Sequence, residues 1–180
     1  SIACNFATRM VFVRTLSQDY LGIEGLFSSL LVMLSLAELG IGSAIIYSLY
    51  EPLAKNNREK IRALMQLYRR AYWTIAAIVT TLGIFFSLKL EWFIKEIPDI
   101  KHLRLYFLLF VANTAVSYLY SYKGTLIGAD QKQYLVDIWR YVFTLIMTLG
   151  QIIVLLTTGS YFGFLVCMVV CTFLQNFVVS

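Results

Sequence analysis

Long apolar segments separated by short polar stretches dominate this chain of 180 residues. The longest covers residues 25–50, which at about 1.5 Å per helical residue can cross a bilayer core of about 30 Å. The expected spans cover residues 2–16, 25–50, 71–88, 105–122, 134–157 and 161 onward. This pattern predicts an all-α fold, a polytopic transmembrane helix bundle of about six spans in which the first is truncated.

The connections between these spans carry most of the charges and turn-forming residues. Pro52 is expected to end the second span, because it cannot donate a backbone hydrogen bond. Gly124 and Gly128 are expected to break the helix after the fourth span. Within 51–70, apolar side chains recur at helical spacing and predict an interfacial approach to the third span. The predicted connections are residues 17–24, 51–70, 89–104, 123–133 and 157–160.

Composition agrees with a membrane protein. Hydrophobic residues make up 59% of the chain and charged residues 14%, against roughly 45–50% and 25% in soluble domains; mean hydropathy is +0.74. The net charge of +5 is therefore better explained by membrane topology than by nucleic-acid binding. The sequence has no Gly-rich phosphate loop, nucleophile motif or zinc signature, so we expect no enzyme activity, metal or cofactor. Cys4, Cys167 and Cys171 lie in apolar segments, where small buried thiols are expected.

The distribution of basic residues indicates an orientation. Residues 51–70 and 123–133, with the adjoining helix ends, hold most of the lysine and arginine. Residues 89–104 hold four basic side chains that are nearly balanced by acids, and residues 17–24 and 157–160 contain none. The positive-inside rule therefore places the two basic loops, and the N-terminus with them, in the cytoplasm. Because the chain begins and ends within apolar segments, we expect residues 1–180 to form a single transmembrane domain cut from a longer protein.

One carboxylate, Glu38, interrupts the longest apolar segment. A charge at the centre of a spanning helix costs roughly 2.5–3.5 kcal/mol on insertion scales, so Glu38 is expected to face protein or a wet cavity. Gly40 and Ala44 form a small-xxx-small pair that lets another helix approach. Glu38 is interpreted as either an intramembrane switch or a structural polar anchor. It shares one predicted helix face with Ser28, Ser35 and Gly42.

Two arginines lie within the first span, and arginine cannot shed its charge in lipid. Arg14 lies roughly 9 Å from the predicted turn, where it can reach water or pair with Asp19 or Glu24. Arg9 lies roughly 16 Å from the turn and should face the bundle interior. Glu38 and Arg9 differ in depth by roughly 10 Å. A salt bridge between them therefore needs helix tilt or an intervening water. Alternatively, the two side chains line one cavity at different depths. Alternatively, Arg9 is a packing charge satisfied by neighbouring polar groups.

Polar side chains also form stripes on two later helices. Asp137 precedes Arg140 by three residues, so these two can pair on one face. Both stripes can line a polar cavity, or can serve interhelical hydrogen bonding instead. The stripes consist of Arg140, Thr144, Thr148 and Gln151 on the fifth span, and of Asn113, Ser117 and Ser121 on the fourth.

Two blocks of sequence resemble a known family. Residues 20–27 (YLGIEGLF), 34–42 (LSLAELGIG), Ala44 and 49–54 (LYEPLA) are similar to the first helical hairpin of bacterial polysaccharide and O-antigen flippases, members of the multidrug/oligosaccharidyl-lipid/polysaccharide exporter superfamily. Residues 117–123 (SYLYSYK) with 129–132 (ADQK) resemble the connection after that family's fourth helix. The resemblance runs along essentially the whole chain. It implies that this chain forms most of the first lobe of a larger transporter of the bacterial inner membrane, which is built from two six-helix lobes.

The resemblance also implies a function: export or flipping of a lipid-linked oligosaccharide, a precursor of O-antigen, capsule or teichoic-type polysaccharide, by alternating access. The expected partners are the lipid-linked phosphate or diphosphate oligosaccharide, membrane lipid and the missing second lobe. Arg9 is the expected ligand of the phosphate head, because a guanidinium fork binds phosphate. Further candidate substrate-binding residues are Arg14, Arg140, Gln151 and Asn113. The alternatives are an ion-coupled drug exporter of the same superfamily, a non-transporting membrane subunit, or an inert fragment.

Overall fold

The computed structural model describes residues 2–16, 18–35, 41–89 and 102–179. All regular structure in these ranges is helical. The helices are α1 Ile2–Thr15, α2 Gln18–Ser35, α3 Ile41–Ala54, α4 Arg58–Leu88, α5 Leu103–Ala129, α6 Gln133–Thr158 and α7 Tyr161–Val179. The predicted all-α class is therefore confirmed for the described chain.

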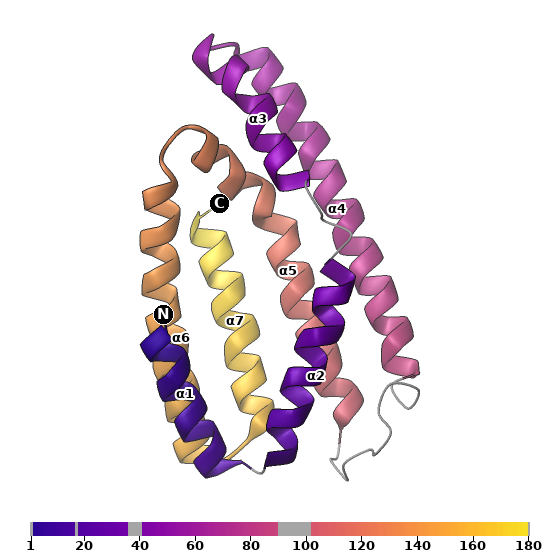
Figure 1. Cartoon of the computed structure of the whole chain (residues 1–180), viewed down its shortest axis with the longest axis vertical. Helices are drawn as coiled ribbons and strands as arrows, with labels where there is room; N and C mark the ends of the chain where they lie inside the picture. The colour runs from indigo at the N-terminus through magenta and orange to yellow at the C-terminus, as the bar shows by residue number, and fades with distance from the viewer. Residues whose placement is uncertain (1, 17, 36–40, 90–101, 180) are drawn as a thin grey trace.

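The helices form a bundle whose members alternate in direction (Figure 1). Helices α1, α4 and α6 run one way, and α2, α3, α5 and α7 run the other. In the bundle α4 packs on α5, α5 on α7, α7 on α6 and α6 on α1, while α2 and α3 contact both α4 and α5. The α3–α4 and α5–α6 turns lie at the same end of the molecule, and the α6–α7 turn lies at the opposite end.

Four of the described helices are long and apolar enough to cross a membrane: α4, α5, α6 and α7. This finding supports a helical membrane protein, but the count differs from the six or so spans expected. Helices α1 and α3 have 14 residues each, or roughly 21 Å at helical rise, which is short of a bilayer core of about 30 Å. The single helix predicted over 25–50 is described as two, α2 and α3. Residues 36–40 between them lie outside the described residues.

The predicted turn over residues 17–24 is wrong, because α2 already begins at Gln18. Asp19 lies in the first helical turn, where its negative charge complements the helix dipole. Gly22 is therefore helical, at a cost of about 1 kcal/mol relative to alanine. A Cβ added at Gly22 or Gly25 would meet no atom within 4 Å, so neither glycine marks a close approach of another helix.

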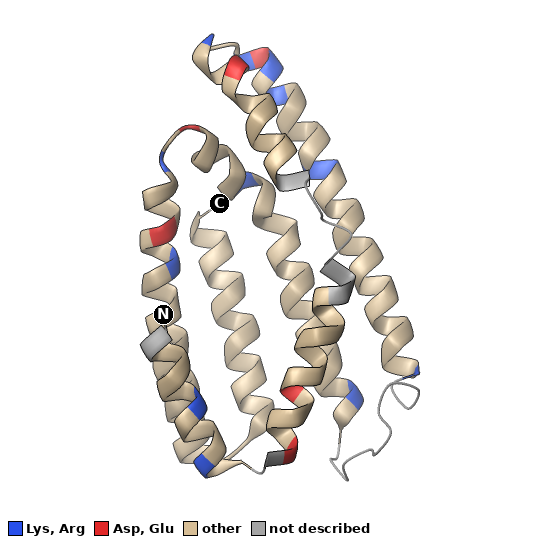
Figure 2. Cartoon of the chain, in the orientation of Figure 1, with Lys and Arg blue, Asp and Glu red and all other residues tan. Residues whose placement is uncertain are grey.

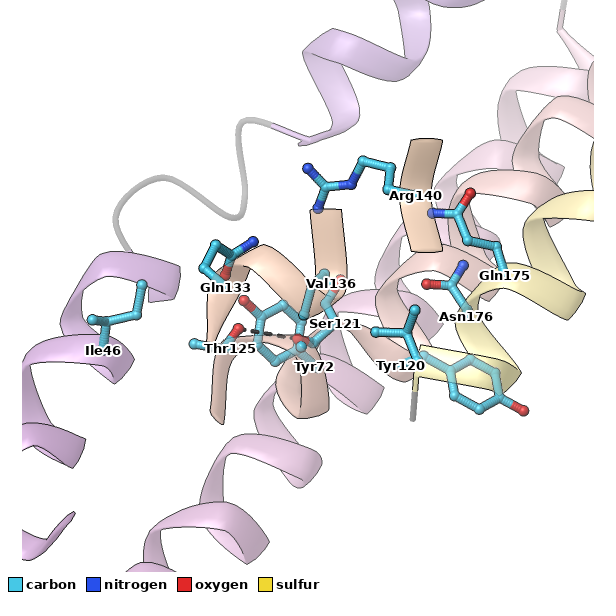
Figure 3. Close-up of a pocket in the computed structure, with 12 residues that line it drawn as sticks. Ile46, Tyr72, Tyr120, Ser121, Thr125, Gln133, Val136, Arg140, Gln175 and Asn176 are labelled. Atoms are coloured by element: carbon cyan, nitrogen blue, oxygen red, sulfur yellow. Dashed lines mark hydrogen bonds between the residues drawn. The ribbon is translucent and has the colours of Figure 1, made fainter. Parts of the chain in front are cut away.

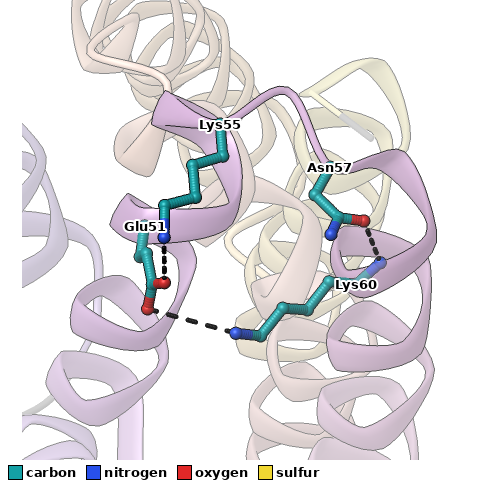
Figure 4. A network of polar contacts seen from close by, with 4 residues as sticks. All are labelled: Glu51, Lys55, Asn57 and Lys60. Atoms are coloured by element: carbon teal, nitrogen blue, oxygen red, sulfur yellow. Dashed lines mark hydrogen bonds and ion pairs between the residues drawn. The ribbon is translucent and has the colours of Figure 1, made fainter.

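The prediction for residues 51–70 is also corrected. Pro52 lies inside α3, which ends only at Ala54, and α4 continues unbroken from Arg58 to Leu88. Asn57 caps α4 by accepting a hydrogen bond from the Lys60 N–H (3.1 Å). Figure 4 shows how Glu51 joins the two helices: its carboxylate lies 2.8 Å from Lys55 Nζ and 4.0 Å from Lys60 Nζ. The hydrogen bond from Lys55 holds the pKa of the exposed Glu51 carboxyl below its usual range.

Helix α5 extends seven residues past its predicted end at 122, so Gly124 and Gly128 do not break it. The helix ends beyond them, where Gln131 takes a left-handed backbone conformation with φ of 60°. A Cβ on Gly128 would come within 2.6 Å of Gln133 Oε1, so this glycine gives the start of α6 room to turn back. The predicted turn at 157–160 is confirmed, with Gly159 as the left-handed C-cap of α6.

Buried aromatic rings connect the helices at the end of the bundle that holds the α6–α7 turn. Tyr161, at the start of α7, packs against Phe12 of α1, Tyr20 of α2 and Tyr106 of α5, with ring centroids 4.9–5.8 Å apart. Deeper in the bundle, Phe27 of α2 is fully buried against α5. These contacts fix α1 and α2, which carry the candidate substrate-binding arginines and Glu24, against the longer helices.

Helices α4 and α5 approach each other closely at Gly83. A Cβ at this buried position would lie 2.6 Å from Cγ1 of Val111. We therefore expect Gly83→Ala to destabilise the protein by roughly 1–3 kcal/mol, because overpacking forces the two helices apart. Unfolding in mixed detergent micelles measures this change.

Gly22→Ala is the matched control for this prediction. It adds the same methyl group in a helix where nothing lies within 4 Å, so its stability should stay equal or rise by up to about 1 kcal/mol. Adding Val111→Ala to Gly83→Ala should recover part of the loss, because it removes the clashing methyls. Equal stability of the Gly83→Ala and Gly22→Ala proteins would contradict the close approach of α4 and α5.

Candidate functional site

A cavity of about 310 Å³ lies among α1, α2, α6 and α7, and we call it the Arg9 cavity. Polar groups enter it from three helices, and Phe12, Phe164 and two methionines supply its apolar surface. Its polar lining residues are Asn5, Thr8, Arg9, Glu24, Thr148 and Gln151. The structure thus brings together two residues that the sequence identified separately, Arg9 and Gln151.

Helical spacing explains how these side chains reach one place. Thr8 and Arg9 follow Asn5 by three and four residues, so all three lie on one side of α1, which packs on α6. Thr148 and Gln151 are separated by three residues on α6 and are only 8% and 5% exposed. Buried polar groups are costly unless they find partners, so a polar cavity wall accounts for their position. Arg9 is itself exposed at the mouth of the cavity.

Glu24 is a residue of this site that the sequence interpretation missed. Its side chain lines the same cavity as Arg9. The helix boundaries explain why: α1 ends at Thr15 and α2 begins at Gln18, so Arg9 and Glu24 each lie six residues, or roughly 9 Å at helical rise, from those neighbouring helix ends. The sequence interpretation placed the turn later and therefore treated Glu24 as a turn residue. Recognising Asp19 as a helix-start residue would have revealed this depth match.

Arg9 nevertheless keeps its donors available. The ion pairs found among the described residues do not include Arg9. A guanidinium group that is attracted by a carboxylate but not clamped to it can still present its planar fork to a second anion. The Arg9 cavity therefore combines a permanent positive charge, a titratable acid, and buried hydroxyl and amide groups.

A second cavity, of about 340 Å³, lies nearer the end of the bundle that holds the α5–α6 turn, and we call it the Arg140 cavity. Figure 3 shows Arg140 of α6 with Gln175 and Asn176 of α7 around this space. As predicted, Arg140 pairs with Asp137 (3.5 Å). Asp137 also accepts a hydrogen bond from Gln133 (3.3 Å). The charge of Arg140 is thus largely compensated, and this cavity offers mainly amides and hydroxyls.

The stripe predicted on α6 connects the two cavities. Arg140 lines one cavity, Thr148 and Gln151 line the other, and Thr144 lies between them. The Thr144 hydroxyl donates to the Arg140 carbonyl (2.7 Å). Eleven residues separate Arg140 from Gln151, or roughly 16 Å along the helix. Polar groups therefore follow α6 through about half the thickness of a bilayer core.

Of the other candidate residues, Ser121 lines the Arg140 cavity, whereas Arg14, Asn113 and Ser117 lie outside both cavities. Arg14 is exposed near the end of α1, and Asn113 of α5 has a buried Oδ1 without a hydrogen-bond partner among the described residues. The Ser117 and Ser121 hydroxyls donate to carbonyls four residues earlier in α5, at 3.0 and 2.9 Å. Their hydrogen bonds are thus within one helix, rather than between helices as the alternative interpretation expected.

The predicted Glu38 site cannot be placed. Glu38 and Gly40 lie outside the described residues, as do the side chain of Ser35 and the surroundings of Gly42. Ser28, on the same predicted face, is exposed. The carboxylate that the described structure places opposite Arg9 is therefore Glu24.

Cysteine and metal chemistry receive little support from the described part of the chain. Cys4, Cys167 and Cys171 are free thiols and are partly buried. No three His, Cys, Asp or Glu side chains in the described ranges come close enough together to hold a metal ion.

Comparison of the chain with protein-family models, with curated proteins and with solved structures gives no match.

Proposed function

We propose that this chain is one lobe of a membrane transporter that flips a lipid-linked oligosaccharide with an anionic phosphate head across a bacterial cell membrane. The observation that carries the proposal is the Arg9 cavity, where a permanent cation meets buried hydroxyl and amide groups between apolar helices. The resemblance of residues 20–54 to polysaccharide and O-antigen flippases supports the choice of substrate.

Charge explains the role of each group in this proposal. Lipid excludes a phosphate head as strongly as it excludes a carboxylate, so the head needs a cation during its passage. Arg9 supplies that cation through its guanidinium fork. Glu24 lies in the same cavity and balances the charge of Arg9 when no substrate is bound. Thr148 and Gln151 donate to and accept from the sugar hydroxyls.

In this proposal, the polar stripe on α6 is the path along which the substrate crosses the membrane. The compensated charge of Arg140 suits hydroxyl-rich sugars, whereas the Arg9 cavity suits the phosphate head. Alternating access requires a second lobe that closes the exposed side of Arg9. In the proposed topology, α1 and the α2–α3 pair each form one crossing, which restores six spans.

The proposed orientation follows the basic residues. The α3–α4 and α5–α6 turns share one end of the bundle, and Figure 2 shows more lysine and arginine toward that end than at the opposite end. The positive-inside rule assigns that end, and the N-terminus with it, to the cytoplasm of the bacterial inner membrane.

One observation favours a second candidate, an ion-coupled exporter of cationic drugs. Such an exporter needs an acid in its cavity, and Glu24 is an acid in the Arg9 cavity. Arg9 argues against a drug exporter, because its positive charge repels a cationic substrate from the same cavity. A non-transporting subunit has no comparable need for both charges.

Reconstitution of the full-length protein into liposomes tests the proposal. We expect translocation of a fluorescently labelled polyprenyl-diphosphate oligosaccharide well above that of protein-free liposomes, and no proton-driven movement of a cationic dye such as ethidium. Movement of the dye without the lipid would favour the drug exporter. Movement of neither would contradict a transport function.

A further inference from the structure

The outer face of α4 carries a groove of about 670 Å³ that the proposed transport route does not use. The residues that line it, which we call the α4 groove, are Gln66, Arg69, Arg70, Trp73 and Thr74. All five side chains are exposed. The opposite face of α4 is buried against the bundle through Tyr72, Ile75 and Val79. The groove therefore opens away from the protein core, toward whatever surrounds the bundle.

Helix length places this groove at the level of lipid headgroups. Helix α4 has 31 residues, or roughly 46 Å at helical rise, which exceeds a bilayer core of about 30 Å. Its uncharged part, residues 71–88, accounts for roughly 27 Å of this length. Figure 2 shows the basic residues of α4 confined to the part beyond that segment. Arg69 and Arg70 are the first charges past the apolar part, and Trp73 is a residue type enriched at membrane interfaces.

Within the described part of the chain, the positive charges in the groove have no anionic partner. The ion pairs found there include neither Arg69 nor Arg70. Glu51, which lies near the end of α3, is already paired with Lys55 and Lys60. The Arg69 guanidinium instead lies 4.8 Å from the centre of the Trp73 ring, which orients it without neutralising it.

The apolar surface next to the groove continues along the helix. Below Trp73, the same face of α4 carries Ile84 and Leu88, which are 50% and 61% exposed. A ligand bound in the groove therefore meets two cations and an indole at one end and a strip of hydrocarbon at the other. A lipid with an anionic headgroup has this distribution of charge and apolar surface, whereas free phosphate has only the charged half.

We propose that the α4 groove is a binding site for an anionic phospholipid, with the headgroup phosphate held by Arg69 and Arg70 and an acyl chain lying along the exposed apolar face of α4. Arginine is suited to this role because its fork donates two parallel hydrogen bonds to phosphate oxygens. Trp73 holds the Arg69 side chain at the height of the phosphate and packs on the glycerol region. This site does not depend on the proposed transport function, because it requires only that α4 spans the membrane.

Quenching of Trp73 fluorescence by brominated lipid tests the proposal. The protein carries Trp92→Phe and Trp139→Phe, so that Trp73 is its remaining tryptophan, and is reconstituted in phosphatidylcholine nanodiscs. Titration with brominated phosphatidylglycerol should quench Trp73 at a much lower mole fraction than brominated phosphatidylcholine does. Arg69→Gln with Arg70→Gln should lower this preference roughly tenfold. Arg69→Lys with Arg70→Lys should retain part of it, because lysine keeps the charge but loses the fork.

A matched control removes two positive charges at the opposite end of the bundle, one at the C-cap of α4 and one in the first turn of α5. Lys89→Gln with Arg104→Gln should leave the preference of Trp73 for phosphatidylglycerol unchanged. In the protein with both arginines intact, high salt should weaken the preference for phosphatidylglycerol. This measurement requires no substitution in the α4 groove. Millimolar inorganic phosphate should neither shift Trp73 emission nor displace the lipid. The proposal is overturned by equal quenching from both lipids, by a preference that survives loss of both arginines, or by free phosphate that competes as well as the lipid.

Discussion

Replacing Arg9 with alanine is expected to lower translocation of a lipid-linked oligosaccharide by roughly 100-fold. Arg9 is the basic side chain that lines the Arg9 cavity. Hydrogen bonds to charged groups contribute about 1.5–3 kcal/mol, and each 1.4 kcal/mol is a factor of ten. The rate of flipping in reconstituted liposomes, at equal amounts of inserted protein, measures the loss.

Arg9→Lys should retain part of the activity, because lysine keeps the positive charge but not the two-donor fork. Arg58→Ala is the control for removal of an arginine: Arg58 is exposed at the start of α4 and lines neither cavity. Its transport rate should match that of the unaltered protein. Normal transport by Arg9→Ala would remove the assignment of the phosphate head to this cavity.

A second substitution, at Glu24, tests whether Arg9 and Glu24 act at the same site. With Arg9 removed, Glu24 is an uncompensated acid at the same depth in the cavity and repels an anionic head. Arg9→Ala combined with Glu24→Gln should therefore lose less activity than the two separate effects added together. This non-additivity would locate both side chains at one site, which a general loss of folding would not do.

The apolar pattern was sufficient to predict the helices whose ends carry clear signals. Helix α6 was expected at 134–157 and is found at Gln133–Thr158, with Gly159 capping it in a left-handed conformation. The start of α7 at Tyr161 was also predicted. In both cases a long apolar run ends at a compact polar turn, so periodicity and turn chemistry agree.

Glycine and proline misled the prediction elsewhere. Gly22, Gly124 and Pro52 were read as turn or break positions, but each lies within a helix. In an apolar surrounding, leaving a helix exposes backbone groups that water cannot satisfy, so the helix persists through a residue of low propensity. The close approaches of helices occur at other glycines, such as Gly83 and Gly150, which no local sequence pattern distinguishes.

The candidate site was also predictable only in part. Residues on a single helix, such as Thr148 and Gln151, could be assigned to one face from their spacing. Their meeting with Arg9 depends on α1 packing against α6, which helix periodicity does not specify. The pairing of Arg9 with Glu24 required the position of the α1–α2 turn, and an error of a few residues there moved the predicted partner to another depth.

The second large effect concerns Phe27, which holds α2 against α5. Its side chain is fully buried, and its ring centroid lies 5.0 Å from that of Phe107 and 5.5 Å from that of Phe110. Phe27→Ala removes both ring contacts and leaves a cavity. Because lipid removes most of the hydrophobic driving force between helices, we expect the packing loss to dominate and to cost roughly 2–4 kcal/mol. Unfolding in mixed detergent micelles measures the change.

Phe6→Ala is the control for this prediction, because Phe6 is 66% exposed on α1 and its removal should change stability by less than about 0.5 kcal/mol. A double-mutant cycle with Phe107→Ala should show coupling of about 0.5–3 kcal/mol. Since Glu24 lies one helical turn before Phe27 on α2, loosening this contact should also release Glu24 from its position opposite Arg9 and slow transport. Equal stability losses in the Phe27→Ala and Phe6→Ala proteins would mean that α2 does not pack on α5, and that the Arg9 cavity has no fixed wall on that side.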